Sequence, residues 1–507
     1  MKLVRPVLFA AAALATVVPA LAVGGLLAPA GASPATTCMG KPVTIVATAK
    51  VMKGTEGDDV VAMTPGAWNS FSALGGDDTI CLTHGAPSGG RDPQGSWGYV
   101  NAGHGNDVVV NESTQASSMT IFLGAGEDRF IGSSYSETVF TDVESDDDFT
   151  PSPGSQRDVV EMGGGASVLT YGDEVWTLPS ADGLNADAIS FGSGSAELHY
   201  RGSMTPQGSV DLSQATPTFL NLSAVLPPDP KGAERKVLVD APAARVTVDG
   251  AQALAWQGHV DTWEFGEYQA PSWDFSVSFL GTEADESLSF VHGYVGEVRL
   301  GAGDDSVEGG YGNWLHTRAL DGGPGRDRVE YYRACQRLTA RLGSQVDCDG
   351  QIVPLNGFEH VVVSSIAKRS RVTAIGTDGR DSAHVFGDRV AFHGGRGADQ
   401  AVLSGKVARA NGGPGADRLT AFARDAILRG HGGPDVLTLS YNDLRYKRAH
   451  ATRQVALGGP GNDVLAGSST KVGDRLIGGP GRDRVNGRGG KDYCDAEITK
   501  ACKRAQS

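Results

Sequence analysis

Past Leu27 the chain has no apolar run long enough to cross a bilayer. It also lacks the HExxH helix of zinc proteases and the GxSxG turn of serine hydrolases, and its 11 histidines are scattered. No Cys-x-x-Cys pair or neighbouring His pair suggests a zinc site. These absences argue against an integral membrane protein and the commonest hydrolases, and we predict no catalytic residue.

Glycine, by contrast, is abundant, at 71 of 507 residues, while hydrophobic residues still make up 40%. A disordered Gly/Ser linker would lack the Val, Ile and Leu to bury, so this composition favours a folded chain. The formal net charge is −15. An acidic surface disfavours nucleic acid and anionic membranes and suits a cation as partner.

The first 32 residues resemble a Sec-type signal peptide. Lys2 and Arg5 precede an apolar run from Val7 to Leu27, and Ala30-Gly31-Ala32 predicts cleavage before Ser33. Ala20-Leu21-Ala22 is a second possible cleavage site, and an uncleaved membrane anchor is the alternative interpretation. We expect a secreted, extracellular protein with no membrane span in the mature chain.

The six cysteines are even in number, and in an extracellular protein disulfides are the default state. Proximity in sequence suggests Cys335–Cys348 and Cys494–Cys502, which leaves Cys38–Cys81. Six cysteines allow fifteen pairings, so other connectivities stay open.

One short pattern, Gly-Gly-x-Gly-x-Asp-x-apolar, recurs along the chain. A full copy reads Gly322-Gly323-Pro324-Gly325-Arg326-Asp327. Other full copies end at Asp399, Asp417, Asp463 and Asp483, variants end at Asp381, Asp435 and Asp492, and weaker copies end at Asp59, Asp78, Asp107, Asp128 and Asp305. The residue two positions after each aspartate is always apolar. This register predicts a tight turn followed by a short strand with one side chain pointing inward.

The spacing of the aspartates predicts stacked coils. Asp381, Asp399, Asp417 and Asp435 are eighteen residues apart, and Asp483 and Asp492 are nine apart. Asp327 and Asp381 are fifty-four apart, which we interpret as three eighteen-residue coils. The intervals around Asp463 do not fit and indicate insertions. Two nine-residue units would form one coil, and stacking would put the motif turns in a single row.

These turns carry the oxygen ligands that calcium prefers. Calcium takes six to eight hard oxygen ligands, and glycines with φ > 0 let successive carbonyls converge on one point while aspartate supplies the carboxylate. No Cys or His recurs at a ligand position. We predict several Ca²⁺ ions, each between two turns, held by the thirteen aspartates and by the carbonyls of Gly323, Gly325, Gly395, Gly397, Gly413, Gly415, Gly459, Gly461, Gly479 and Gly481. The alternative is that the turns are only turns, with Asp bonded to its own backbone.

The motifs resemble the RTX, or haemolysin-type, calcium-binding nonapeptide repeats, and the chain is also similar to actinobacterial secreted calcium-binding proteins. The resemblance is clear over about residues 281–495 and weaker over 50–165, and we expect repeat regions over 281–507 and 33–165. It implies an all-β fold, a right-handed parallel β-roll or β-helix solenoid, with calcium between turns. Most copies here are single, and some depart from the motif, as at Leu300-Gly301 and Ala284.

Residues 166–280 lack the motif but stay β-like, with Trp256, Trp263 and Trp273 among them. A ligand-binding face or a buried core would each explain these aromatics, and we favour the core. Asp142 to Asp148 is an acidic cluster that we expect to form a solvated loop.

The sequence therefore predicts a secreted calcium-binding repeat protein with a structural or adhesive role and folding coupled to calcium. A cell-surface or extracellular partner is possible. The alternatives are a carrier module for another activity and a glycosidase- or lyase-type enzyme on a β-helix, whose carboxylates would be hidden among the repeat acids.

Overall fold

The computed structural model describes residues 37–47, 51–63, 70–82, 98–112, 119–142, 157–164, 173–177, 184–224, 235–266, 275–291, 293–309, 314, 317–440, 453–502 and 504–506. In this part of the chain the regular elements are β-strands, and no helix is long and apolar enough to cross a membrane. The signal segment 1–32, Trp273 and residues 143–148 of the acidic cluster lie outside the described residues.

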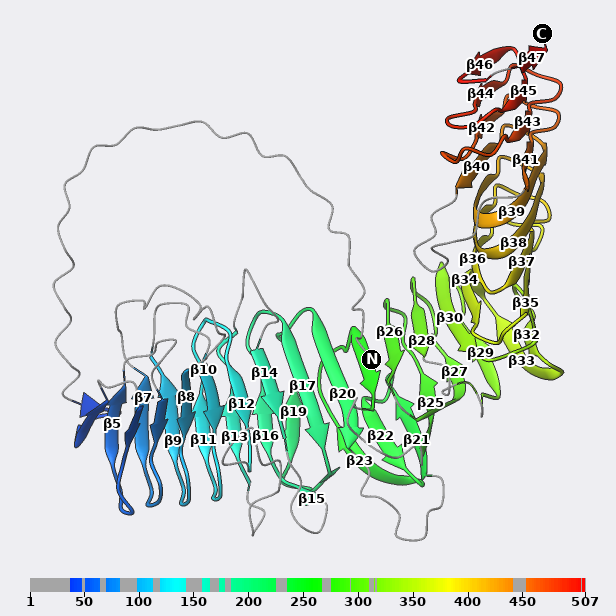
Figure 1. The fold of residues 1–507 in the computed structure, drawn as a ribbon. Coiled ribbons are helices and arrows are strands. Elements are labelled where there is room, and N and C mark those ends of the chain that lie inside the picture. Colours follow the sequence, from blue (N-terminus) through cyan, green and yellow to red (C-terminus); the bar gives the residue numbers. More distant parts are fainter. Residues whose placement is uncertain are drawn as a thin grey trace, which may run out of the picture. The chain divides into compact units, whose positions relative to one another are not determined.

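The strands of the N-terminal half alternate between two rows, and within each row neighbours pair in parallel (Figure 1). The first row contains β3 (Ile45–Ala47), β5 (Val60–Met63), β7 (Thr79–Leu82), β9 (Val108–Asn111), β11 (Arg129–Ile131), β13 (Val159–Glu161), β16 (Ala188–Ser190) and β19 (Ser209–Asp211). The second row contains β4 (Val51–Lys53), β6 (Ser70–Ser72), β8 (Gly98–Asn101), β10 (Met119–Phe122), β12 (Thr138–Phe140), β14 (Asp173–Trp176), β17 (Ala196–Arg201) and β20 (Thr218–Ala224). Two short pairs, β1 (Thr37–Cys38) with β2 (Lys41–Pro42) and β15 (Leu184–Asn185) with β18 (Ser203–Met204), lie outside these rows.

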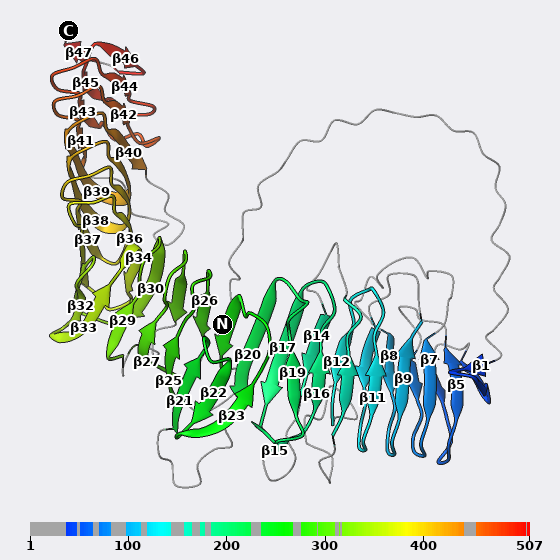
Figure 2. The same cartoon turned by 180° about the vertical axis from the view of Figure 1, so that it is seen from behind.

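The second row continues into the C-terminal half (Figure 2). Its further strands are β24 (Thr262–Phe265), β26 (Ser287–Phe290), β28 (Ser306–Gly309), β30 (Asp327–Arg333), β34 (Phe358–Ser365), β36 (Ser382–Phe386), β38 (Gln400–Pro414), β39 (Arg418–Gly432), β40 (Val436–Ser440), β42 (Val464–Ala466), β44 (Arg484–Asn486) and β46 (Ile498–Lys500).

A third row alternates with these strands. It contains β21 (Arg235–Asp240), β25 (Phe275–Leu280), β27 (Tyr294–Arg299), β29 (Ala319–Asp321) and β33 (Gln351–Asn356), and then β31 (Arg337–Arg341), β35 (Arg371–Ile375), β37 (Arg389–His393), the later parts of β38 and β39, β41 (Arg453–Leu457), β43 (Arg475–Ile477), β45 (Tyr493–Asp495) and β47 (Arg504–Gln506). Two antiparallel meanders interrupt the parallel pairing: β21 with β22 (Arg245–Val248) and β23 (Ala251–Ala255), and β31 with β32 (Gln345–Cys348) and β33.

The residue two positions after each motif aspartate points into the core, as the sequence predicts. Ala401, Leu419 and Leu437 are aligned across neighbouring strands and fully buried. The other ten residues at this motif position are buried as well: Val61, Ile80, Val109, Phe130, Val307, Val329, Ala383, Leu465, Val485 and Cys494. One continuous apolar core runs from Ala47 to Cys494.

The interval from Asp327 to Asp381 is not three eighteen-residue coils, so that interpretation was wrong. Val329 pairs with Val361, and Val361 pairs with Ala383. The interval therefore contains two coils of unequal length rather than three equal coils. The antiparallel meander β31–β33 accounts for the longer first coil. Past Asp435 the predicted insertion is present, since Leu437 pairs with Leu465 rather than with a residue eighteen positions on.

All three suggested disulfides are present, Cys38–Cys81, Cys335–Cys348 and Cys494–Cys502. Trp256 and Trp263 are buried and pack edge to face at 5.2 Å. The core interpretation of these two aromatics is therefore confirmed.

Candidate metal-binding rows at the aspartate turns

The motif aspartates lie under their turns, immediately before the strands. All thirteen side chains are buried, the most exposed being Asp59 at 7%. They do not form the single row that the sequence predicts. Those of the N-terminal half precede strands of the first row, whereas most of those beyond Glu286 precede strands of the second row, and Asp492 precedes a strand of the third. The side of the fold that carries the acids therefore changes along the chain.

A backbone-to-carboxylate hydrogen bond links consecutive acids. The N–H of Asp381 donates to Oδ1 of Asp399 at 2.9 Å, and the N–H of Asp399 donates to Oδ1 of Asp417 at 2.8 Å. Repetition of this bond gives four acid rows: Asp59–Asp78–Asp107–Asp128–Asp158–Asp187, Glu286–Asp305–Asp327–Glu359, Asp381–Asp399–Asp417–Asp435–Asp463–Asp483–Glu497, and Asp474–Asp492.

The first glycine of the motif makes room for this carboxylate. A Cβ on Gly412 would lie 2.0 Å from Oδ2 of Asp417, and one on Gly394 would lie 2.3 Å from Oδ2 of Asp399. The glycines at the second and fourth positions of the motif are needed for close stacking of the turns. A Cβ on Gly415 would lie 1.4 Å from the carbonyl oxygen of Gly397 in the neighbouring turn.

The same close approach occurs at the other predicted carbonyl donors. A Cβ on Gly323, Gly325, Gly413, Gly459, Gly461, Gly479 or Gly481 would lie between 1.6 and 2.4 Å from a carbonyl oxygen of the neighbouring turn, and the carbonyl of Gly395 is one of those oxygens. The packing explains these glycines without an ion, and their role as calcium ligands stays a prediction.

Two kinds of turn treat the second carboxylate oxygen differently. In the first kind the second motif residue has φ > 0, as Gly395 does at 106°, and its N–H donates to the carbonyl of the next turn, Gly412, at 3.1 Å. Oδ2 of the aspartate is then buried without a hydrogen-bond partner among the described residues. This holds for Asp78, Asp107, Asp128, Asp305, Asp327, Asp399, Asp417, Asp435, Asp463 and Asp483. Oδ2 of Asp158, whose preceding turn lies outside the described residues, is also buried without a hydrogen-bond partner in the described part of the chain.

The second kind of turn begins each row and has Thr or Ser in place of that glycine. Thr377 donates its N–H to Oδ2 of Asp381 at 2.6 Å and its Oγ1–H to the same oxygen at 3.1 Å. Thr55 likewise donates both groups to Oδ2 of Asp59, and Thr282 donates both to Oε1 of Glu286, whose Oε2 is buried without a hydrogen-bond partner among the described residues. Ser468 donates its N–H to Oδ2 and its hydroxyl to Oδ1 of Asp474. The first acid of a row accepts no N–H from a preceding acid, and the hydroxyl residue supplies the donors instead.

Burial makes the charged form of these acids costly. Burial, together with the smaller effect of neighbouring acid charges, raises the pKa of Asp399 to about 6, that of Asp435 to about 7 and that of Asp107 to about 8. The hydrogen bond from the adjacent backbone N–H acts in the opposite direction but does not cancel the effect of burial.

An exposed set of side chains accompanies the buried acids of the first row. The N–H of Asp77 donates to Oδ1 of Asp58 at 2.9 Å, and the N–H of Asn106 donates to Oδ1 of Asp77 at 2.8 Å. These residues directly precede the motif aspartates, so the turns from Asp59 to Asp128 each present one buried and one exposed oxygen-bearing side chain.

Sequence reasoning missed the tightest carboxylate group of the first row. Asp142, Asp158 and Asp187 are all buried, and one oxygen from each lies within 4.8 Å of the others. Asp142 is therefore not part of a solvated loop, as we had expected of the acidic cluster. The missed signal was the Asp-x-apolar register without glycines, at Asp158-Val159-Val160 and Asp187-Ala188-Ile189. Asp474 was missed for the same reason.

A comparison with models of known protein families finds no match, and a comparison with curated proteins finds no significant match either.

Gly430 and Gly432 offer a matched test within one turn. A Cβ on Gly430 would lie 2.0 Å from Oδ2 of Asp435, whereas nothing lies within 4 Å of a Cβ on Gly432. We expect Gly430→Ala to lower the free energy of unfolding by about 1–3 kcal/mol, because the carboxylate must leave the N–H of Asp417. Gly432→Ala should be neutral or slightly stabilising, by about 0.4–1 kcal/mol. Urea denaturation measures both, and equal losses would contradict the role of the first glycine.

The raised pKa values predict an inverted pH dependence for the calcium-free chain. Acids whose pKa is about 7 to 8 when folded, such as Asp435 and Asp107, hold protons that the unfolded chain releases near pH 4. The stability that these protonated acids contribute is complete below their pKa in the unfolded chain. It is lost as the pH rises through their pKa in the folded chain. The pKa values of His360 and His384 are lowered in the folded chain, so these two residues make the stability rise with pH, but only below about pH 6.5.

The Tm of the calcium-free chain should therefore fall between pH 6.5 and pH 8. Thermal unfolding followed by circular dichroism measures this, with calcium-saturated protein as the control. A Tm that stays level or rises over this window without calcium would contradict the assignment of buried, protonated acids.

Proposed function

We propose that this chain is a secreted calcium-binding repeat protein, folded as a right-handed parallel β-roll or β-helix, in which Ca²⁺ bound at the acid rows stabilises the fold. The observation that carries the proposal is the repeated Oδ2 oxygen, buried in eleven aspartates without a hydrogen-bond partner among the described residues. An anionic oxygen buried without a partner is costly, and a bound cation removes that cost.

The donor chemistry favours calcium over other metals. The motif acids supply only hard oxygens, and carbonyl oxygens of the stacked turns are further oxygen donors in the same turns. Thiolate and imidazole metals have no recurring ligand in the acid rows. Magnesium requires stricter octahedral geometry and retains more water, which suits a long row of equivalent turns poorly.

Calcium binding would then depend on the compartment. At low calcium the rows combine buried acids at close spacing, and each must hold a proton or repel its neighbours. Extracellular calcium modules bind at roughly 10⁻⁴–10⁻³ M, so these rows would fill outside the cell. Binding free energy thereby becomes folding free energy, which suits a structural or adhesive surface protein.

Calcium titration of the chain beginning at Ser33 tests this proposal. Isothermal titration calorimetry and thermal unfolding should show several ions bound and a Tm that rises with calcium but far less with magnesium. Calcium at a hundred times its Kd stabilises a one-site protein by about 2.7 kcal/mol. The double variant Asp399→Asn/Asp417→Asn should bind fewer ions and gain less stability from calcium.

The matched control is Glu308→Gln/Asp347→Asn, which removes the same two charges on β28 and β32, outside the acid rows and their turns, and should titrate like the parent chain. Absence of binding heat, together with a Tm unchanged by a calcium chelator, would show that the turns are only turns. Equal losses in both double variants would show that net charge rather than the acid rows attracts the ion.

A further inference from the structure

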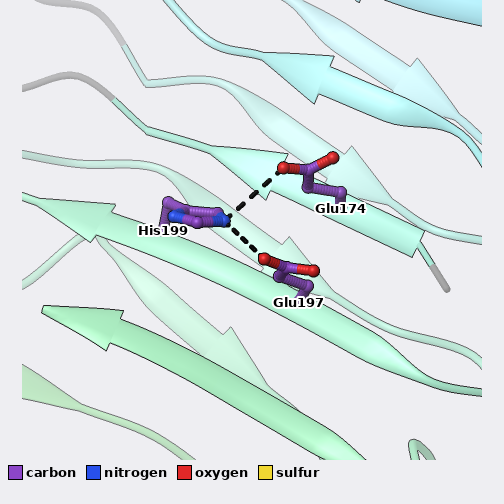
Figure 3. A group of neighbouring side chains, drawn as sticks. All are labelled: Glu174, Glu197 and His199. Carbon is purple, nitrogen blue, oxygen red and sulfur yellow. Dashed lines mark hydrogen bonds and ion pairs between the residues drawn. The ribbon is translucent and has the colours of Figure 1, made fainter. Parts of the chain in front are cut away.

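A second group of potential metal ligands lies away from the acid rows, on β14 and β17 (Figure 3). Strand register pairs Glu174 with Glu197 and Trp176 with His199. The intervening residues Val175 and Leu198 are fully buried in the core. Because side chains alternate along a strand, the four paired residues project together from the opposite face of the sheet.

The three ligand atoms converge. Nε2 of His199 lies 2.9 Å from Oε1 of Glu197 and 3.5 Å from Oε1 of Glu174, and all three groups offer an atom within 4.8 Å of the others. Zinc binds His nitrogen and carboxylate oxygen at about 2.0–2.2 Å, so two ligands of a tetrahedral ion lie about 3.3–3.5 Å apart. The observed separations bracket that value without movement of the backbone.

Neighbouring side chains fix the ligands in place. The imidazole of His199 stacks on the indole of Trp176, with ring centroids 3.5 Å apart and planes 4° apart. The indole N–H of Trp176 donates to Oε1 of Glu174, and Thr138 donates its hydroxyl to Oε2 of the same residue. Partners that orient the ligands in this way are typical of metal sites and strengthen binding.

The group is recessed but open to solvent. The side chain of His199 is 7% exposed, while those of Glu174 and Glu197 are 25% and 20% exposed. An ion could therefore enter and keep water in its remaining position, as zinc does at three-ligand sites. Two carboxylates with one imidazole carry a net negative charge in either protonation state of the imidazole, which favours a cation.

We propose that Glu174, Glu197 and His199 bind one divalent transition-metal ion of the zinc type. The imidazole ligand and the small number of ligands distinguish this site from the all-oxygen acid rows, and calcium is a poor occupant. An ion here ties β14 to β17 across the sheet face. The proposal does not depend on calcium binding at the acid rows.

The test uses the chain beginning at Ser33, stripped of metal with a chelator and then saturated with calcium, titrated with Zn²⁺ by calorimetry and with Co²⁺ by absorption and tryptophan fluorescence. We expect one equivalent bound at this site, a rise in Tm with Zn²⁺, and quenching of Trp176 by Co²⁺. His199→Gln and, separately, Glu197→Gln should each weaken binding by about 100-fold or more.

Two controls make the result specific. His259→Gln removes a half-exposed histidine that lies 3.7 Å from a single carboxylate, Asp261, and should bind like the parent chain. Trp176→Phe should abolish most of the cobalt quenching while retaining bound metal. Cooperative thermal unfolding of each variant, followed by circular dichroism, shows that it folds.

Zinc binding that survives both His199→Gln and Glu197→Gln, or no zinc bound by the folded parent chain, would overturn the proposal. In the second case Glu174, Glu197 and His199 would be a buried ion-pair group. If the chain binds zinc but not calcium, only the function proposed for the acid rows is rejected.

Discussion

The structure depends on one repeated interaction, the hydrogen bond from the backbone N–H of one buried acid to the carboxylate of the next. It joins residues such as Asp399 and Asp417 across neighbouring strands and so sets the distance between consecutive turns. A hydrogen bond to a charged acceptor stabilises more than a neutral one, but it satisfies only one of the two carboxylate oxygens. Burial of the remaining oxygen is the cost of this arrangement, and a proton or a cation must offset it.

Several features of the sequence follow from this constraint. Glycine at the first motif position leaves space for the folded-back carboxylate, as at Gly412 under Asp417. Threonine or serine begins each row because the first acid has no preceding N–H, as at Thr377. The long rows end at Glu359 and Glu497, which accept the last N–H as an aspartate would, or at Asp187, which Thr141 also contacts. The residues of the motif are therefore explained by the packing of the carboxylate as well as by the geometry of the turn.

Much of the fold could be predicted from the sequence because its signals are local. The Asp-x-apolar register predicted which residues enter the core, and proximity suggested two of the disulfides, which left the third pair. The prediction of a single row of turns was wrong, because a meander such as β31–β33 adds strands without any motif and one acid row ends at Glu359, which belongs to no glycine-aspartate motif. The Glu174–Glu197–His199 group could not be predicted, since its members meet only through the register of β14 and β17.

The most direct test of the account is infrared spectroscopy of the carboxyl groups at neutral pH. Without calcium, the account predicts an absorption band from protonated, buried carboxyl groups, since burial raises the pKa of acids such as Asp107 to about 8. Adding calcium should remove this band and increase the carboxylate bands in step with the number of ions bound. A calcium-free, folded chain that shows no protonated carboxyl band, and whose carboxylate bands do not change with calcium, would contradict the central claim that the buried acids require either a proton or a cation.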